Sequence, residues 1–213
     1  MKDHIKATIK TYNKIAPYYK ITATPELRKW EEESIDRFIN YLPGNLVLVP
    51  GCGDGRDSRY LISKNIHVSS FDLSAGMLNE AIKEDPNGNY FLYDIRNIIN
   101  INKTYDGIWA SGCLYHLSNN EFNNFIMDSL SILKKSGILY LNMKEGKGSE
   151  FIDKPKSNEY PGGIESKILL TGKRYYSYYS HDELLLYFSK YKILYERELK
   201  YTEKGFEFWL MKI

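Results

Sequence analysis

The sequence has 213 residues, a formal net charge of +2 at pH 7 and two cysteines, a length that suits one α/β domain and is short for two. The small net charge and the interspersed charged residues argue against a nucleic-acid-binding surface, and no apolar run approaches the roughly 20 residues that span a bilayer. Because the first residues lack the apolar segment of a signal peptide, and the cysteines form neither a CxxC pair nor a Cys/His cluster, we expect a cytoplasmic protein without a disulfide or a metal site.

Residues 1–24 carry apolar side chains at helical spacing, and Pro17 should interrupt the helix that this spacing predicts. A second helix is expected over 25–41. Thr24 would be its N-cap and Pro25 its first helical residue, and the Pro-Gly pair at 43–44 would end it.

The apolar run over 46–50 leads directly into three alternating glycines, Gly51, Gly53 and Gly55. Glycine is needed where the backbone bends sharply or lies against a ligand, so this pattern predicts a buried parallel strand that turns into a helix over 57–65. Such a turn favours a nucleotide-like ligand held by main-chain N–H groups at the helix start. A dinucleotide-binding fingerprint would place its third glycine at position 56, where this chain has Arg56.

Asp72 follows the next predicted strand, 67–71. A carboxylate at this strand tip can accept hydrogen bonds from both hydroxyls of a ribose. The alternative is that Asp72 only caps the following helix, but Ser74 already supplies an N-cap, so we favour the ribose contact.

The segment Gly51-Cys52-Gly53-Asp54-Gly55 together with Asp72 resembles the first two motifs of class I S-adenosylmethionine (AdoMet)-dependent methyltransferases. The resemblance covers residues 12–213 and is strongest over 46–77. It implies AdoMet as cofactor, S-adenosyl-L-homocysteine (AdoHcy) as product and no metal. The chain departs from the family at Val49, where many members carry an acidic residue that helps to hold the methionine ammonium group.

The resemblance also implies the positions of the cofactor contacts. Tyrosines of the N-terminal segment would touch the methionine end, although they could equally pin the first helix to the sheet. Leu73 and Met77 would pack on the adenine or ribose, and Asp94 and Ile95 would lie beside the adenine. The expected cofactor-binding residues are Tyr12, Tyr19, Gly51, Cys52, Gly53, Gly55, Arg56, Asp72, Leu73, Met77, Asp94, Ile95, Ser111 and Gly112.

The loop after the fourth predicted strand, 106–111, resembles the family segment that faces the reacting methyl group. Tyr115 and His116 would therefore face the methyl group or the acceptor, and His is the natural proton acceptor near neutral pH. The alternative for His116 is a purely structural role.

The second half of the chain begins with an amphipathic helix over 119–134, which Lys-Lys-Ser-Gly at 134–137 would end, and a fifth strand over 138–143. Residues 144–180 are irregular and should cover the cleft and select the acceptor. Their tyrosine cluster at 175–179 is either an edge strand or an aromatic wall around a flat or cationic acceptor. A last helix over 181–190 precedes an antiparallel strand pair at 192–199 and 206–212.

These elements predict a doubly wound α/β fold with a Rossmann-like sheet of seven strands. The resemblance supplies the strand order 3-2-1-4-5-7-6, with strand 7 antiparallel. We expect a single methyltransferase domain over 1–213, with an N-terminal helical lid at 1–44, a cofactor-binding core at 45–143, an acceptor cap at 144–180, and the last helix and closing hairpin at 181–213.

The expected function is methyl transfer to a small-molecule acceptor through an N, O or S nucleophile, by in-line displacement. Residues 47–50 resemble thiol- and thiopurine-methylating groups, so a sulfur acceptor is included. The alternatives are an AdoMet-binding partner or scaffold without catalysis and a dinucleotide-dependent oxidoreductase. No nucleic acid or membrane partner is expected, and the protein would be a monomer or a homodimer.

Overall fold

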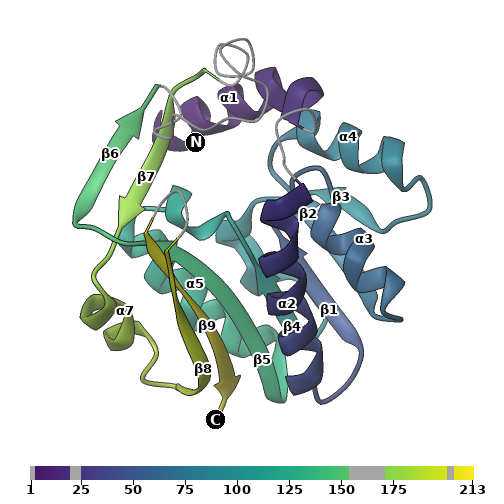
Figure 1. The fold of residues 1–213 in the computed structure, drawn as a ribbon, viewed down its shortest axis with the longest axis vertical. Coiled ribbons are helices and arrows are strands. Elements are labelled where there is room, and N and C mark those ends of the chain that lie inside the picture. Colours follow the sequence, from purple (N-terminus) through teal and green to yellow (C-terminus); the bar gives the residue numbers. More distant parts are fainter. Residues whose placement is uncertain (1–2, 20–24, 154–170, 201–203) are drawn as a thin grey trace.

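The computed structural model describes residues 3–19, 25–153, 171–200 and 204–213, and only the backbone of 25–28 (Figure 1). Its first half contains α1 (Asp3–Tyr19), α2 (Pro25–Tyr41), β1 (Leu46–Pro50), α3 (Arg56–Ser63), β2 (His67–Asp72), α4 (Ala75–Glu84), β3 (Tyr90–Leu92) and η2 (Ile95–Asn100). Its second half contains β4 (Tyr105–Ala110), η3 (Leu114–His116), α5 (Asn119–Ile132), β5 (Leu133–Lys144), β6 (Gly148–Ile152), β7 (Arg174–Tyr178), α7 (His181–Tyr187), β8 (Tyr191–Leu199) and β9 (Gly205–Lys212).

A seven-stranded sheet forms the centre, with the order β3-β2-β1-β4-β5-β9-β8. The strands from β1 to β5 pair in parallel, and β9 runs antiparallel to both β5 and β8. The predicted fold and order are confirmed, with β8 and β9 as the sixth and seventh strands of the prediction. The strand order reverses between β1 and β4, and an open α/β sheet binds ligands in the crevice outside the carboxyl ends of its strands at such a point.

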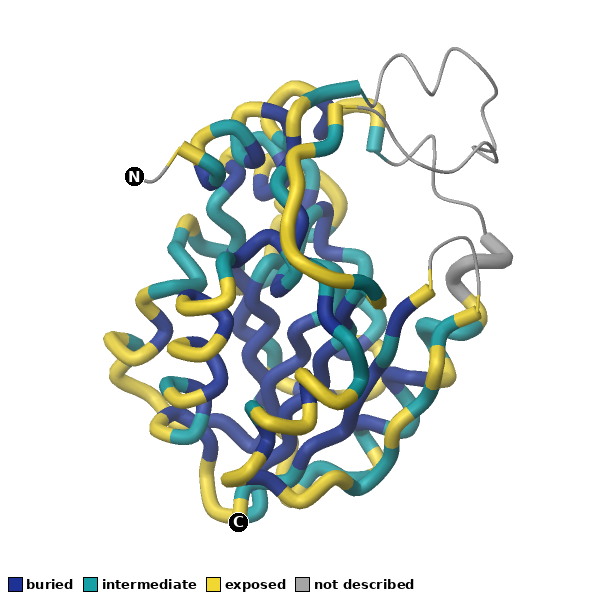
Figure 2. Tube along the Cα trace, turned by 90° about the vertical axis from the view of Figure 1, so that its left-hand side faces the viewer, coloured by how far each residue is buried: buried dark blue, intermediate teal, exposed yellow. Residues whose placement is uncertain are grey.

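Helices cover both faces of the sheet. On one face α2 and α3 pack on β1, β4 and β5 through a buried cluster that includes Phe38, Leu61, Trp109, Tyr140 and Trp209. On the other face α5 and α7 pack on the sheet through a larger cluster that includes Leu48, Phe122, Phe125, Leu139 and Leu184. Figure 2 shows the result, with buried residues along the sheet and exposed residues on the outer sides of the helices.

The first helix lies across the carboxyl ends of the strands, at the top of the sheet in Figure 1. The side-chain oxygen of Asn13 accepts hydrogen bonds from the Ser74 hydroxyl (2.8 Å) and the Gly76 N–H (2.9 Å) at the start of α4. The predicted interruption at Pro17 was wrong, because α1 continues to Tyr19. Pro17 lies in the last turn of α1, and the buried neighbours Ile15 and Ala16 hold this turn by packing.

The boundary between α5 and β5 also differs from the prediction. The helix ends at Ile132, and Leu133 already pairs with Tyr105 of β4. The Lys134 ammonium group, expected at the helix end, instead lies 2.9 Å from the Asp106 carboxylate. A cation from a distant strand contacts the last carbonyls, since the Lys212 ammonium group donates to the oxygens of Leu130 (2.6 Å) and Leu133 (2.7 Å).

The cap segment contains a two-stranded antiparallel ribbon, β6 and β7, in which only β7 had been foreseen as an edge strand. The ribbon joins α1, because the Tyr175 N–H donates to the Thr8 hydroxyl (3.0 Å) and the Thr11 hydroxyl donates to the Lys173 carbonyl (2.8 Å). The rest of the predicted cap, 154–170, lies outside the described residues. The last helix, α7, ends at Tyr187, earlier than predicted. None of the described helices is long and apolar enough to cross a membrane.

Candidate functional site

A cavity of about 330 Å³ lies at the carboxyl ends of β1, β2 and β4, under α1 and the first part of α2. Of the sixteen residues that the sequence assigned to cofactor or catalysis, all except Gly55 line it. The lining residues that the sequence analysis did not assign include Trp30, Glu31, Asp54, Asp57, Trp109, Cys113 and Asn142.

The glycine turn bends as its sequence predicts, because Gly51, Gly53 and Gly55 all have positive φ angles, of 64°, 57° and 77°. A Cβ at Gly51 would lie 2.4 Å from the Cβ of Cys113, so this glycine allows two loops to meet. A Cβ at Gly53 would approach only the Met77 methyl group, at 3.3 Å, so the backbone there is open to the cavity. Gly55 instead packs against Tyr90 and Ala81 and shapes the start of α3 without lining the cavity.

The Asp72 carboxylate is fixed at the tip of β2 by the backbone of two turns. One oxygen accepts the Gly53 N–H (2.9 Å), and the other accepts the Ser74 N–H (2.8 Å). Burial raises the pKa of Asp72, and these N–H groups oppose that shift. Ser74 is the N-cap of α4, as predicted, since its side chain accepts the Met77 N–H. A carboxylate oxygen accepts more than one hydrogen bond, so Asp72 can still receive one ligand hydroxyl on each oxygen.

The adenine end expected from the resemblance is walled by Leu73, Met77 and Ile95 together with Asp94. Both oxygens of Asp94 are engaged by the Arg96 guanidinium, whose Nε lies 2.9 and 3.1 Å from them. Although burial acts in the opposite direction, these hydrogen bonds hold the pKa of Asp94 below its usual value. Asp94 can therefore accept a hydrogen bond from a ligand only with a lone pair that Arg96 does not use.

Ser111 and Gly112 line the cavity beyond β4, with Gly112 at a φ of 71°. The Gly112 N–H donates to the Asn142 side-chain oxygen (2.7 Å), which fixes this loop on β5. The two cysteines, Cys52 and Cys113, are free and line the same wall. Burial raises the pKa of both thiols, so they stay protonated at neutral pH.

At the other end of the cavity, His116 is held between α1 and β7. Its Nε2 accepts the Tyr12 hydroxyl (2.8 Å), while its Nδ1 donates to the Tyr175 carbonyl (2.7 Å). Burial lowers the pKa of His116 to about 3, with smaller contributions from Arg174 and Lys144. A pKa this low does not suit the role of proton acceptor near neutral pH that the resemblance suggested for His116.

The tyrosines at this end form an aromatic group around His116. The Tyr115 ring stacks on Tyr176, with centroids 5.5 Å apart. The Lys144 ammonium group lies 5.0 Å from both of these ring centroids. Tyr176 therefore belongs to the predicted edge strand, and of the two stacked rings only that of Tyr115 lines the cavity. Burial raises the pKa of Tyr12 and of Tyr115 well above the usual value, so both are neutral phenols.

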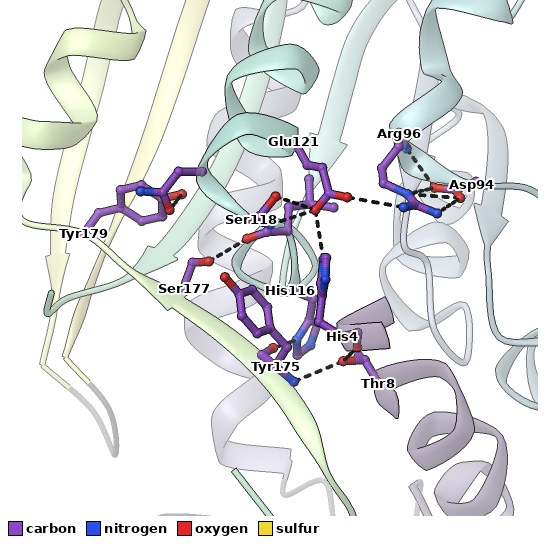
Figure 3. Close-up of polar contacts among 12 residues, drawn as sticks. His4, Thr8, Asp94, Arg96, His116, Ser118, Glu121, Tyr175, Ser177 and Tyr179 are labelled. Atoms are coloured by element: carbon purple, nitrogen blue, oxygen red, sulfur yellow. Dashed lines mark hydrogen bonds and ion pairs between the residues drawn. The ribbon is translucent and has the colours of Figure 1, made fainter. Parts of the chain in front are cut away.

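Glu121 makes polar contacts with residues of α1, η2 and the start of α5 (Figure 3). Its carboxylate accepts the Ser118 N–H (2.9 Å) and hydroxyl (2.7 Å) at the start of α5. It also lies 2.9 Å from His4 Nε2 of α1 and 3.2 Å from Arg96 Nη1, and the same Arg96 holds Asp94. One polar network thus joins α1, the start of α5 and η2, and through Arg96 it includes Asp94.

The sequence could have indicated two acidic residues of the cavity. Asp54 directly precedes Gly55, the last glycine of the turn, and Asp57 lies two residues after it. The Asp57 carboxylate accepts the Trp109 indole N–H (2.8 Å). Asn142 and Trp109 had no local signal, since their place in the cavity depends on how β4 and β5 pair. Among the described residues, no three His, Cys, Asp or Glu side chains are grouped to hold a metal ion.

Residues 47–137 match a protein-family model described as a methyltransferase domain. The chain is 29% identical over 109 residues to a malonyl-[acyl-carrier protein] O-methyltransferase of Enterobacter lignolyticus, a match that covers 50% of this chain and 41% of the relative. It is 28% identical over 131 residues to the tRNA (carboxymethyluridine(34)-5-O)-methyltransferase of Saccharomyces cerevisiae, covering 60% of this chain and 44% of that protein. The chain thus spans less than half the length of these curated relatives.

Among solved structures, the DhpI–SAH complex has a similar fold, where SAH is AdoHcy. It superimposes with a TM-score of 0.70 at 16% sequence identity, covering 97% of this chain and 96% of that one.

Proposed function

We propose that this chain, a class I S-adenosylmethionine-dependent methyltransferase by its fold and its methyltransferase-domain match, transfers a methyl group from AdoMet to a small-molecule acceptor. The observation that carries the proposal is the placement of the Asp72 carboxylate. It lies at the tip of β2, tied to Gly53 of the glycine turn and lining the cavity.

The residues of the cavity fit AdoMet in three ways. The Asp72 oxygens have acceptor capacity for the two ribose hydroxyls. The backbone at Gly53 is open to a ligand. Apolar side chains of Leu73, Met77 and Ile95 wall the end where an adenine would lie. When bound, AdoMet supplies an electrophilic methyl group on a positively charged sulfur.

The part of the protein in the reaction is to orient the acceptor and exclude water. The small residues Ser111 and Gly112 leave room beside β4, and the ring of Tyr115 borders the same space. Because α1 lies over the cavity, a bound acceptor would be held between this helix and the sheet.

The low pKa of the buried His116 argues against acceptors that must lose a proton to a base before they attack the methyl group. A base with a pKa of about 3 has little driving force to remove a proton from an alcohol or a phenol. Tyr12, its hydrogen-bond partner, is a neutral phenol with a raised pKa. We therefore favour a nucleophile that needs no base at neutral pH, namely a carboxylate, a thiolate or an unprotonated amine. The similarity to a malonyl-[acyl-carrier protein] O-methyltransferase supports a carboxylate oxygen as our first choice among these.

A methyl-transfer screen tests the proposal. The purified protein is incubated with AdoMet labelled in its methyl group and with matched carboxylate, thiol, amine and phenol acceptors, and a tRNA fraction serves as a further arm. We expect label in the carboxylate, thiol or amine arm and none in the phenol arm. A protein that binds AdoMet but labels nothing, including a cell extract, would support the non-catalytic binding module instead. Lack of AdoMet and AdoHcy binding by calorimetry would overturn the proposal.

A further inference from the structure

Asp54 is a buried carboxylate in the middle of the glycine turn. Asp54 is only 3% exposed, and it lines the cavity. One oxygen lies 3.4 Å from the Arg56 Nε, and the other has no hydrogen-bond partner among the described residues. A buried carboxylate oxygen without a donor is costly, and such groups in native proteins are normally satisfied by a partner or a ligand.

The strand that precedes the turn contributes no charge to the cavity. Val49 lines it with an apolar side chain that is 2% exposed. Many members of the family that this chain resembles carry an acidic residue at this position. Val49 cannot hold an ammonium group in that way. Any carboxylate for a cationic group near the end of β1 must come from another residue.

The position of Asp54 relative to Asp72 suits such a role. Gly53 donates its N–H to Asp72, and Asp54 is the next residue of the same turn. A ligand whose sugar is bound by Asp72 would therefore lie next to the turn that contains Asp54. The other acidic residue at this turn, Asp57, has an oxygen engaged by the Trp109 indole.

A zwitterionic group needs a cation as well as an anion, and Arg56 supplies the cation. It lines the cavity beside Asp54, and its guanidinium lies 5.8 Å from the ring centroid of Tyr19 at the end of α1. Asp54 and Arg56 together present one negative and one positive charge to a single place in the cavity. This pairing matches the ammonium and carboxylate groups of an α-amino acid.

We infer that Asp54 accepts a hydrogen bond from the ammonium group of AdoMet and AdoHcy, in place of the acidic residue that is missing at Val49. The inference rests on the proposed function and assigns a binding residue within its site. Asp54 thereby makes the site select a complete amino-acid end over the bare nucleoside thioether.

The test compares two ligands by isothermal titration calorimetry on the full chain. AdoHcy carries the amino-acid group, whereas 5′-methylthioadenosine keeps the adenosine and the sulfur and lacks that group. The measured quantity is the dissociation constant of 5′-methylthioadenosine divided by that of AdoHcy. In Asp54→Asn we expect this ratio to fall at least tenfold, about 1.4 kcal/mol, because AdoHcy binds more weakly while 5′-methylthioadenosine binding changes less than about twofold.

Asp182→Asn is the matched control, since it makes the same chemical change at an exposed carboxylate of α7 outside the cavity, and it should keep the wild-type ratio. A deaminated analogue of AdoHcy should bind wild type and Asp54→Asn equally well. Retention of the wild-type ratio in Asp54→Asn would overturn the inference. If Asp54→Asn does not fold, as judged by circular dichroism, Asp54→Ser provides the same comparison.

The failure of this inference is distinguishable from the failure of the proposed function. A wild-type protein that binds neither ligand contradicts the proposed function. A wild-type protein that binds both, with a ratio that no substitution at Asp54 changes, contradicts only the role of Asp54.

Discussion

Asp72 is the residue on which the proposed AdoMet site most directly depends, because it lies at the tip of β2 and accepts the N–H groups of Gly53 in the glycine turn and of Ser74 at the start of α4. We expect Asp72→Ala to weaken AdoHcy binding at least tenfold, about 1.4 kcal/mol, since both ribose hydroxyls lose their acceptor. Isothermal titration calorimetry measures the change. The control is Asp182→Ala, which removes an exposed carboxylate on α7. Equal affinities of Asp72→Ala and wild type would contradict the assignment.

His116 gives a prediction about pH. Its pKa of about 3 means that the imidazole is already neutral throughout the range from pH 5 to pH 8. The methyl-transfer rate with a carboxylate acceptor should therefore show no inflection from His116 near pH 6.5. The measurement is a pH–rate profile under saturating AdoMet for wild type and His116→Asn. An inflection near neutrality that is present in wild type and absent from the variant would show that His116 titrates during catalysis.

At the scale of elements, Glu121 joins α5 to α1 and η2 and makes stability depend on pH. Burial opposes ionisation of Glu121, but hydrogen bonds from Ser118 and His4 prevail and lower its pKa to about 2, from an ordinary value of 4.5. As pH falls, the unfolded chain takes up this proton near pH 4.5, whereas the folded chain resists until about pH 2. The stability that Glu121 contributes is thus complete above pH 4.5 and is lost between these two values.

Glu121→Gln should therefore flatten the fall in unfolding free energy between pH 4.5 and pH 3. Urea unfolding curves at several pH values measure this slope. Asp182→Asn, which changes an exposed carboxylate of α7, should keep the wild-type slope. A variant at position 121 with an unchanged slope would show that another group carries the acid sensitivity.

The elements that sequence analysis predicted well are those whose signals are local. The first strand, β1, is an apolar run that leads into the glycine turn, and this turn carries its own backbone requirement. The boundary of α5 depended on distant groups, because β4 pairs with Leu133 and Lys212 contacts the helix end. The ribbon of β6 and β7 joins segments separated by more than twenty residues, which no local pattern indicates.

The same distinction applies to the site. Fifteen of the sixteen assigned residues line the cavity, Tyr12 and Tyr19 from α1 and the others from strand ends or the segments that follow them. Gly55 is the exception because a glycine pattern does not show which glycine faces the ligand. The charge state of His116 depended on burial between α1 and β7, which only the folded chain establishes. The Asp54 oxygen that lacks a hydrogen-bond partner within the described part of the chain likewise became visible only in three dimensions.

At the scale of the whole molecule, the cavity lies between the first helix, the first crossover turn and the central strands, so a ligand there contacts several parts of the fold at once. A ligand that binds only the folded chain stabilises it by about 2.7 kcal/mol at one hundred times its dissociation constant. For a domain of this size, 1 kcal/mol shifts the melting temperature by roughly 2–4 °C. AdoHcy at that concentration should therefore raise the melting temperature by about 5–10 °C.

Scanning fluorimetry with AdoHcy, NAD and NADP in parallel measures this shift and distinguishes an AdoHcy-binding site from a dinucleotide-binding site. We expect no shift with the dinucleotides. Arg56 occupies the position at which their pyrophosphate requires a third glycine, and Arg56 lines the cavity beside Asp54. Asp72→Ala should shift less than wild type at the same AdoHcy concentration, because its sites are less occupied. A shift with NAD or NADP and none with AdoHcy would instead favour the oxidoreductase, and it would mean that the turn after β1 binds a phosphate despite Arg56.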